Sequence, residues 1–378
     1  MPPKKAAAKK AAAKKPTSAL QRAEEAFRDS WGQDSLDNSG IVEPYEVIST
    51  GCLSVDYSMG VGGYVLGRLY EVWGVDAIGK TTFVMQGARE AQRQYPDRIV
   101  AWIDVEHTFD KAWALVHGID LERLWIIRPE SAEHVADQVK DLIRTGIVSM
   151  VVLDSIGAMI PEAEKEKDAD KAVMAQQAKI VTRMVKIAAV EADANRVVVI
   201  MLNQVRANLS YGADTTTGGG FALKHVTTGK LKLSRSGTEP FKAPLPGESG
   251  PVRVGHEVVV MNERNKVAPP FKRAQFVLFT TASEKYGPPG IDRVDDAVTM
   301  GIKTGVIAQS GAWYTLPGAD AALQGREAVV GAVREDPELL EVIRTRTLAT
   351  LSGEIIVGDE ADPLADPETG EILSEGSE

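Results

Sequence analysis

The sequence predicts an α/β protein with a mostly parallel, doubly wound sheet, and two observations carry this prediction. Between about residues 47 and 281, candidate strands alternate with glycine-rich turns and candidate helices, which is the order that parallel sheets require. Most of the candidate strands are also continuous apolar runs, as expected for strands that helices cover on both faces. With 378 residues, 44% of them hydrophobic, the chain can bury such a core and carry smaller appended parts.

The chain opens with a basic arm. Residues 1–17 contain six lysines and no acidic residue, and this composition is too charged and too poor in apolar residues to pack. We therefore expect residues 1–17 to be disordered. The lysines could clamp the phosphates of a nucleic acid, or the arm could simply keep the protein in solution.

A short amphipathic helix is predicted next, from Ser18 to about Trp31. Apolar residues recur there at helical spacing, namely Leu20, Ala23, Ala26 and Phe27. The apolar face of a helix outside the main core needs a partner surface to cover it. We assign residues 18–46 to this N-terminal segment.

Residues 47–283 are expected to form the core. Its candidate strands are Leu69–Trp73, Ile99–Ile103, Leu124–Ile127, Met150–Leu153 and Val197–Leu202. Helical segments lie between them, from Gln86 to Gln94 and from Ala132 to Arg144. This alternation predicts helices on both faces of one sheet.

The sequence pattern changes after about Glu284, where turns that contain Gly and Pro are followed by helical segments. We expect a smaller α+β domain over residues 284–352, with helices at Gly325–Arg334 and Pro337–Leu351. Residues 353–378 contain nine acidic residues and no basic one. They are expected to form a disordered acidic tail.

Net charge argues against nucleic-acid binding by the protein as a whole. The formal charge is −10, and without the six arm lysines and the nine tail acids the remainder still carries −7. Any contact with DNA must therefore come from local loops. The sequence has no apolar run of membrane-spanning length and no signal-peptide pattern, so we expect a cytoplasmic protein.

A phosphate-binding loop follows the first candidate strand. Residues 74–82 match GxxxxGK followed by Ser or Thr, and they lie between a strand and a helical segment, which is the context that makes such a match specific. In this pattern the lysine reaches the β- and γ-phosphate oxygens and the threonine ligates Mg²⁺. We predict that ATP and Mg²⁺ bind at this loop, which consists of Gly74, Val75, Asp76, Ala77, Ile78, Gly79, Lys80, Thr81 and Thr82.

Carboxylates end two of the other candidate strands. Asp154 follows the run Met150–Leu153, at the edge where open parallel sheets bind ligands. Alone it would more often cap a turn, but beside a phosphate loop it becomes a partner for Mg²⁺ through water. Glu106 closes another strand and is a candidate to orient the attacking water, with a surface loop carboxylate as the alternative.

These blocks, taken together, resemble the bacterial RecA recombinase family. The resemblance runs from about residue 21 to residue 351 and includes the phosphate loop. Further matching blocks follow in the family's order, namely Ile48–Asp56, Ile103–Asp110, Val152–Ser155, Asn203–Arg206, Thr215–Gly219, Asn265–Lys266, Ala268–Phe271 and Gly311–Tyr314. The combination is far more specific than any single motif.

The resemblance implies roles that spacing alone does not assign. Glu106 matches the family's catalytic glutamate, and Gln204 matches the glutamine that senses the γ-phosphate and couples it to the DNA loops. Asp110 and Trp113 fall where the family holds adenine. Two cations, Arg264 and Lys266, match lysines that the family projects onto the ATP of a neighbouring subunit.

The resemblance also implies contacts with DNA. The family's two DNA loops correspond to about residues 162–175 and 207–221. Outside the resemblance, the first reads as a solvated charged segment and the second as a flexible glycine-rich loop. The positions that match DNA-contacting residues are Lys179, Thr182, Lys186, Arg206, Tyr211, Thr215, Gly218 and Gly219.

Several positions depart from the family pattern. Arginine stands at 264 and tryptophan at 113, so the charge and the aromatic face are kept. His225 stands where the family has a phenylalanine that takes part in switching. The coupling of ATP binding to DNA binding could therefore be tuned differently in this chain. These departures and the basic arm suggest a divergent relative, for which a viral origin is one explanation.

The resemblance implies an ATP-dependent recombinase that forms filaments on single-stranded DNA and exchanges strands with homologous duplex. It also implies ATP at the interfaces between copies of the chain. Two alternatives stay open on the sequence. A ring-forming helicase could use the same core, and a DNA-coating or mediator protein could bind ATP without strand exchange.

Overall fold

The computed structural model describes residues 19–32, 36, 44–159, 171–206, 216–217, 223 and 225–352. The basic arm and the acidic tail lie outside the described residues. The chain divides into two compact units, Met1–Pro44 and Tyr45–Glu378. In the first unit, α1 spans Ala19–Trp31, as predicted to within one residue, and its Phe27 and Trp31 rings lie 6.5 Å apart on an exposed face.

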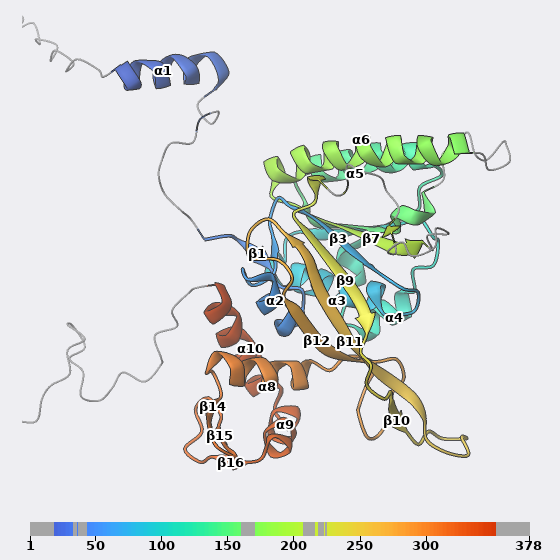
Figure 1. Cartoon of the computed structure of the whole chain (residues 1–378), viewed down its shortest axis with the longest axis vertical. Helices are drawn as coiled ribbons and strands as arrows, with labels where there is room; N and C mark the ends of the chain where they lie inside the picture. The colour runs from blue at the N-terminus through green and yellow to red at the C-terminus, as the bar shows by residue number, and fades with distance from the viewer. Residues whose placement is uncertain are drawn as a thin grey trace, which may run out of the picture. The chain divides into compact units, whose positions relative to one another are not determined.

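The second unit is built around a central sheet of eleven strands within its described residues. Its main path runs β13-β12-β11-β9-β3-β7-β6-β4-β5, of which Figure 1 labels β12, β11, β9, β3 and β7. Strands that carry the site are β3 (Leu69–Gly74), β4 (Ile99–Asp104), β5 (Leu124–Ile127), β6 (Val148–Asp154), β7 (Val198–Arg206) and β9 (Gly229–Arg235). Neighbours among these six strands are parallel, which confirms the predicted fold class.

The sheet continues on one side as an antiparallel extension that the sequence analysis did not predict. It consists of β10 (Phe241–Ala243), β11 (Val252–Asn265), β12 (Arg273–Phe279) and β13 (Gly290–Ile291). Two short strands, β1 (Val47–Ile48) and β2 (Tyr64–Val65), form a separate ribbon. Another, β8 (Thr216–Thr217), pairs with β7 inside the segment that was expected to be the second DNA loop.

Helices cover both faces of the parallel strands. One face packs against α2 (Leu53–Met59), α3 (Lys80–Gln94) and α4 (Lys111–Val116). The other packs against α5 (Ala132–Arg144) and α6 (Lys171–Asn195), which lie side by side in Figure 1. The short 3₁₀ turn η2 (Leu121–Arg123) directly precedes β5, and a second one, η3 (Ile156–Ala158), follows β6.

Three predicted boundaries were wrong. Helix α3 begins at Lys80, not Gln86, because the last residues of the phosphate loop already form its first turn. Helix α6 begins at Lys171, inside the segment 162–175 that was expected to be a loop. Strand β7 continues to Arg206 because Asn203 and Gln204 still pair with β3 despite their polar side chains, and residues 205–206 pair with β8.

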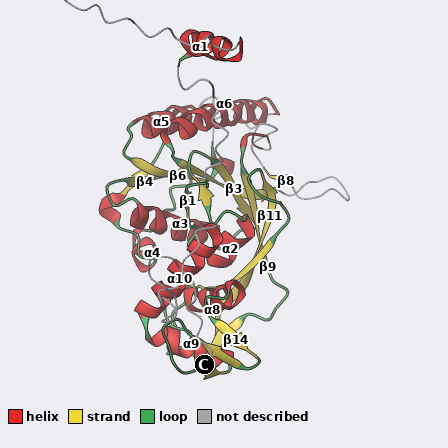
Figure 2. Ribbon diagram, turned by 90° about the vertical axis from the view of Figure 1, so that its left-hand side faces the viewer, coloured by secondary structure: helices red, strands yellow, loops and turns green. Residues whose placement is uncertain are grey.

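The C-terminal part of this unit contains α8 (Arg293–Thr304), α9 (Arg326–Glu335) and α10 (Pro337–Ser352), together with a small sheet of β14 (Ala308–Ser310), β15 (Trp313–Thr315) and β16 (Leu323–Gln324). Figure 2 shows these elements gathered at one end of the unit. Buried Asp296 of α8 accepts hydrogen bonds from the backbone N–H groups of Leu53 and Ser54, at 2.6 and 3.1 Å. This contact ties α8 to the first turn of α2.

A second tie involves buried charges. Glu90 of α3 lies 3.4 Å from Arg344 of α10, and Arg89, Arg93 and Arg293 lie within 3.8 Å of the same carboxylate. Glu90 and Arg344 are 2% and 1% exposed. Helix α3, which starts at the phosphate loop, is therefore also anchored to the C-terminal helices. None of the helices in the described ranges is both long and apolar enough to cross a lipid bilayer.

Candidate nucleotide-binding site

The loop between β3 and α3 is shaped by glycines. Gly79 has φ of +99°, and a Cβ there would come within 2.3 Å of Leu278 Cδ2 on β12. A Cβ on Gly74 would lie 2.4 Å from the carbonyl oxygen of Leu233 on β9. Both positions disfavour a side chain, so the neighbouring parallel strand β9 and strand β12 of the antiparallel extension pack closely against the loop.

Lys80 folds back over this loop. Its Nζ donates to the carbonyl oxygens of Gly74 and Val75, each at 3.0 Å, and lies 3.8 Å from Asp76 Oδ1. Burial lowers the pKa of Lys80, although nearby carboxylates oppose the shift. The ammonium is therefore held at the mouth of the loop, at the start of α3, where a helix favours anions.

Thr81 and Asp154 meet beside the loop. Thr81 Oγ1 donates to Asp154 Oδ2 over 3.1 Å. Burial, together with the charge of Glu106, raises the pKa of Asp154 to about 7. A hard cation suits such oxygen donors, and Mg²⁺ in particular takes one or two protein oxygens and completes its shell with phosphates and water. The described residues contain no cluster of three or more His, Cys, Asp or Glu side chains that could hold a metal without a nucleotide.

Glu106 lies just beyond the end of β4, and two side chains converge on one of its oxygens. Glu106 Oε1 accepts hydrogen bonds from Ser155 Oγ at 2.5 Å and from Gln204 Nε2 at 3.0 Å. Gln204 pairs with Gly74 across the β3–β7 ladder. The predicted catalytic carboxylate and the predicted sensor glutamine are thus in direct contact next to the phosphate loop.

The turn that carries Glu106 is organised by Asp104, which is 1% exposed. Its carboxylate accepts from the backbone N–H groups of Thr108 and Phe109, at 3.0 and 3.2 Å, and from Arg128 Nε at 3.3 Å. A buried carboxylate held by three donors makes a rigid support. Glu106 therefore projects from an ordered turn rather than a loose one.

The two residues expected to hold adenine lie at the start of α4. Asp110 Oδ1 caps this helix by accepting from the backbone N–H groups of Ala112 and Trp113. Trp113 Nε1 donates to Thr82 Oγ1 at 3.1 Å, and its ring meets His117 edge to face with centroids 4.6 Å apart. The indole is thereby fixed against the first turn of α3.

Arg264 and Lys266 lie far from this loop. In the sheet, Asn265 pairs with Gly229, and Gly229 pairs with Tyr70, whereas Gly74 pairs with Leu233. Along β3, Tyr70 at the height of Asn265 and Gly74 at the start of the phosphate loop are four residues apart, which corresponds to about 13 Å. Lys266 Nζ instead donates to the carbonyl oxygens of His225 and Val226, at 2.5 and 3.3 Å. The structure does not bring these two cations to the phosphate loop of their own chain.

The DNA-contacting positions are only partly described. Lys179 and Lys186 are exposed and Thr182 is half-buried, and their spacing places all three on one face of α6. Arg206 ends β7, but its side chain lies outside the described residues, as do Tyr211, Thr215, Gly218 and Gly219.

Two residues of this site escaped the sequence analysis as site residues, Ser155 and Asp104. Both lie at the carboxyl ends of strands, the edge where parallel sheets gather polar groups. Their positions at the ends of β6 and β4 were available from the sequence. Their partners were not, because each contact joins segments that no local pattern relates.

Comparison with known proteins points to one family. The family model described as "RecA N-terminal domain" matches residues 18–283. Protein RecA of Thermotoga neapolitana is 35% identical over 338 residues, which cover 87% of this chain and 92% of that protein. Protein RecA of Thermus thermophilus is 34% identical over 344 residues, covering 90% and 96%, and that of Bacteroides thetaiotaomicron is 33% identical over 328 residues, covering 85% and 94%.

Proposed function

The chain belongs to the RecA family of ATP-dependent recombinases, and from this membership we propose that it assembles helical filaments on single-stranded DNA. Each ATP is bound at an interface between two copies of the chain. The filament then pairs its strand with homologous duplex and exchanges strands, and hydrolysis resets it. This proposal agrees with the family's DNA-dependent ATPase activity.

The contact between Gln204 and Glu106 is the observation that best supports this function. Gln204 belongs to β7, and the chain runs from β7 into the segment that matches the second DNA loop. A change in that segment on DNA binding would act directly on the carboxylate beside the phosphates. ATP hydrolysis that depends on DNA needs such a mechanical link between the two sites.

Within the phosphate site we assign each residue a task. Lys80 neutralises the β- and γ-phosphate oxygens, and the backbone N–H groups of residues 74–82 cradle them. Thr81 would ligate Mg²⁺ directly and Asp154 through water, and the cation would supply charge neutralisation at the phosphates. Glu106 orients the attacking water and accepts its proton.

The adenine end is assigned to α4. Trp113 offers an aromatic face for stacking, held in place by its hydrogen bond to Thr82. Asp110 caps the start of α4 with one carboxylate oxygen, and its second carboxylate oxygen would face the base. Together the two residues would select and orient the base.

Arg264 and Lys266 are assigned to the neighbouring subunit's ATP. Their position about four strand residues below the phosphate loop supports action in trans, because they cannot reach the loop of their own chain. In a head-to-tail assembly, one end of the sheet of each protomer faces the opposite end of the next. Their charge would then stabilise charge that develops on the transferred phosphate.

DNA contact is assigned to α6 and to the loops around β8. Lys179, Thr182 and Lys186 would meet phosphates, joined by Arg206 and by the loop residues Tyr211, Thr215, Gly218 and Gly219. The basic arm would add phosphate contacts, and the acidic tail would compete with DNA for basic surface.

The deciding experiment measures ATP hydrolysis with and without single-stranded DNA, beside electron micrographs of the same mixtures. We expect strong stimulation by DNA and helical filaments. Glu106→Gln should lose turnover and keep filaments, whereas a matched exposed change, Glu122→Gln, should keep both. Rings with unwinding would replace this proposal with a helicase, and DNA coating without turnover would replace it with a mediator protein.

A further inference from the structure

Ser155 occupies a position between the two halves of the nucleotide site. It follows Asp154 at the end of β6 and is 1% exposed. Its hydroxyl donates to Glu106 Oε1 at 2.5 Å. On the other side of the same peptide unit, the Asp154 side chain accepts from Thr81 of the phosphate loop. Of these two successive residues, Asp154 therefore faces the proposed Mg²⁺ position beside Thr81, and Ser155 faces Glu106, which is proposed to orient the attacking water.

The end of β6 also holds the backbone next to Glu106. The carbonyl oxygen of Asp154 accepts from Val105 N at 2.8 Å and from Glu106 N at 3.4 Å. These bonds fix the Cα of Glu106, but they leave rotation of its side chain free. Control of the carboxylate itself therefore falls to the two side-chain donors, Ser155 and Gln204.

Both donors bind the same oxygen. With Oε1 occupied twice, the other oxygen, Oε2, is the one left to face a water molecule. The two donors belong to different parts of the fold. Gln204 leads toward the second DNA loop, whereas Ser155 is buried at the end of a central strand. A shift of β7 would withdraw Gln204 and leave Ser155 in place.

We propose that Ser155 is a positioning residue for ATP hydrolysis, which keeps the Glu106 carboxylate aimed while Gln204 moves between states. The inference rests on the proposed function, in which Glu106 orients the attacking water. Ser155 touches neither ATP nor water in this role and acts only through Glu106. A hydrogen bond to a charged group changes an equilibrium by roughly ten- to hundredfold, which is large enough to decide the orientation of one carboxylate.

The test compares Ser155→Ala with Ser149→Ala in DNA-stimulated ATP hydrolysis by the full chain. Ser149 belongs to the same strand, is equally buried, and donates to the carbonyl oxygen of Ile99 far from the site. Its loss controls for removing a buried hydroxyl from β6. We expect Ser155→Ala to lower kcat at least about tenfold, with KM for ATP changed less than about twofold. Ser149→Ala should leave both close to wild type.

A rescue variant separates positioning from packing. Ser155→Thr keeps the hydroxyl, so kcat should recover most of the loss, while Ser155→Cys offers only a weak donor and should stay low. Unchanged kcat in Ser155→Ala, or a rise in KM that accounts for the whole loss, overturns the inference. If Ser155→Ala does not fold by its thermal melt, the comparison of the Thr and Cys variants decides, and equal kcat for these two overturns the inference.

A double variant tests the shared oxygen. Because Ser155 and Gln204 hold one atom, removing Ser155 should cost a larger factor in the Gln204→Ala background than in the wild type. Equal factors would contradict the inference. Glu106→Gln separates failure of the proposed function from failure of the role of Ser155. If Glu106→Gln retains turnover, the proposed function fails. If it is inactive while Ser155→Ala is like wild type, only the role of Ser155 fails.

Discussion

Gln204 Nε2 donates a hydrogen bond of 3.0 Å to Glu106 Oε1, so the residue that leads toward the proposed DNA loop touches the carboxylate beside the phosphate loop. Such a bond can exist in one state of the filament and be absent in another. It supplies an element whose two states a DNA strand could bias.

Loss of this bond should uncouple hydrolysis from DNA. In Gln204→Ala, DNA can no longer act on Glu106 through the amide, so we expect the ratio of DNA-stimulated to basal hydrolysis to fall at least about tenfold. Steady-state hydrolysis over a range of DNA concentrations measures it. Gln177→Ala is a matched control, since Gln177 on α6 donates to the carbonyl oxygens of Gly157 and Met159. A Gln204→Ala ratio equal to wild type would remove the coupling role.

A mixing experiment tests action across the interface. Lys80→Ala should be inactive because its own phosphate loop can no longer neutralise the phosphates of ATP. Lys266→Ala should be inactive because it supplies no lysine to the ATP of the neighbouring subunit. In a one-to-one mixture about a quarter of the interfaces would combine an intact Lys80 with an intact Lys266. We therefore expect the mixture to regain about a quarter of wild-type hydrolysis. No recovery, with filaments still visible, would place Lys266 in cis, whereas hydrolysis by Lys266→Ala alone would place it outside the reaction.

How much the sequence predicted depends on the range of the interactions involved. The parallel strands were found because burial on both faces leaves continuous apolar runs in the sequence. The phosphate loop was found because its residues are contiguous. Strands β11 and β12 lack such a continuous apolar run, because one of their faces is only partly covered and their residues alternate between buried and partly exposed.

Long-range contacts were the part that the sequence could not supply. Gly79 is in the loop motif, but its packing against Leu278 depends on a strand about 200 residues later. Arg264 and Lys266 were expected near a neighbour's ATP on the resemblance alone, and the sheet register shows only that they lie away from the phosphate loop of their own chain. Ser155 follows the predicted Asp154 directly, yet its partner Glu106 is 49 residues away.

The indole of Trp113 should contribute to nucleotide affinity more than to turnover. Trp113→Phe keeps a ring for stacking and loses the donor to Thr82, so KM for ATP should rise a few-fold. Trp113→Ala should raise it about tenfold or more, because stacking is lost as well. In both variants kcat at saturating ATP should stay within about twofold. Equal KM for all three proteins would place the base elsewhere, and Trp125→Ala, at an exposed position on β5, is the control.

Glu90 should matter for stability rather than for hydrolysis. Burial raises its pKa, but Arg344, Arg89, Arg93 and Arg293 together hold it below the usual value. Glu90→Ala would leave these four cations facing one another, with only the half-exposed Glu341 beside Arg293 and Arg344 as a counter-charge. We expect a loss of about 3–5 kcal/mol in the free energy of unfolding.

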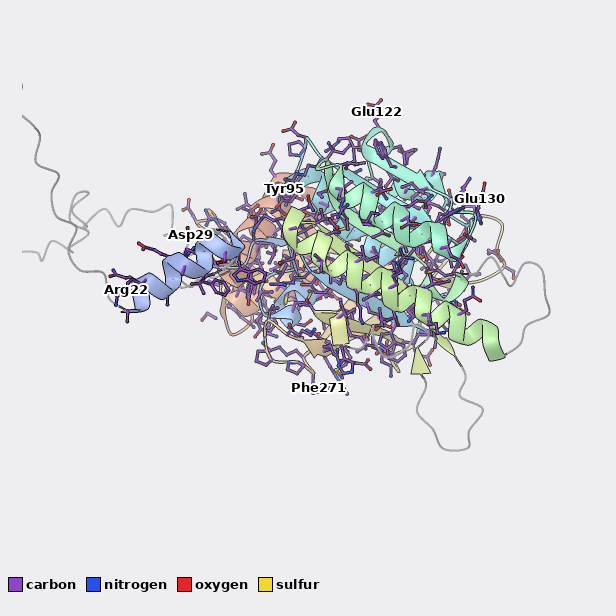
Figure 3. All side chains as sticks on the ribbon, turned by 90° about the horizontal axis from the view of Figure 1, so that it is seen from above. Arg22, Asp29, Tyr95, Glu122, Glu130 and Phe271 are labelled. Carbon is purple, nitrogen blue, oxygen red and sulfur yellow. The ribbon has the colours of Figure 1, made fainter. Side chains whose placement is uncertain are left out.

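Denaturant unfolding of the full chain measures the effect of Glu90→Ala. Glu122→Ala provides the comparison, because Glu122 is an exposed acid on η2 at the molecular surface (Figure 3), and it should change stability by less than about 0.5 kcal/mol. A loss as small as this in Glu90→Ala would mean that water or an anion reaches the four arginines and neutralises them.

Asp56 should make the stability of the chain fall with rising pH. Burial raises its pKa to about 7, although Ser49 and Thr50 donate hydrogen bonds to the carboxylate and oppose the shift. The unfolded chain releases this proton near pH 4, so folding takes up a proton between about pH 4 and 7. The associated stability is complete below pH 4 and is lost as pH rises through 7, with about 2 kcal/mol lost between pH 5 and 7.

Other groups also titrate in this range, so the prediction is a difference between two proteins. Urea unfolding at pH 5, 6, 7 and 8 should show wild type losing stability relative to Asp56→Asn from pH 5 to 7, and the difference should then level off by pH 8. The amide cannot ionise, and its cost of mispairing with Ser49 and Thr50 is the same at every pH. Parallel curves for the two proteins would show that Asp56 is already ionised at pH 5, and that its three hydrogen bonds outweigh its burial.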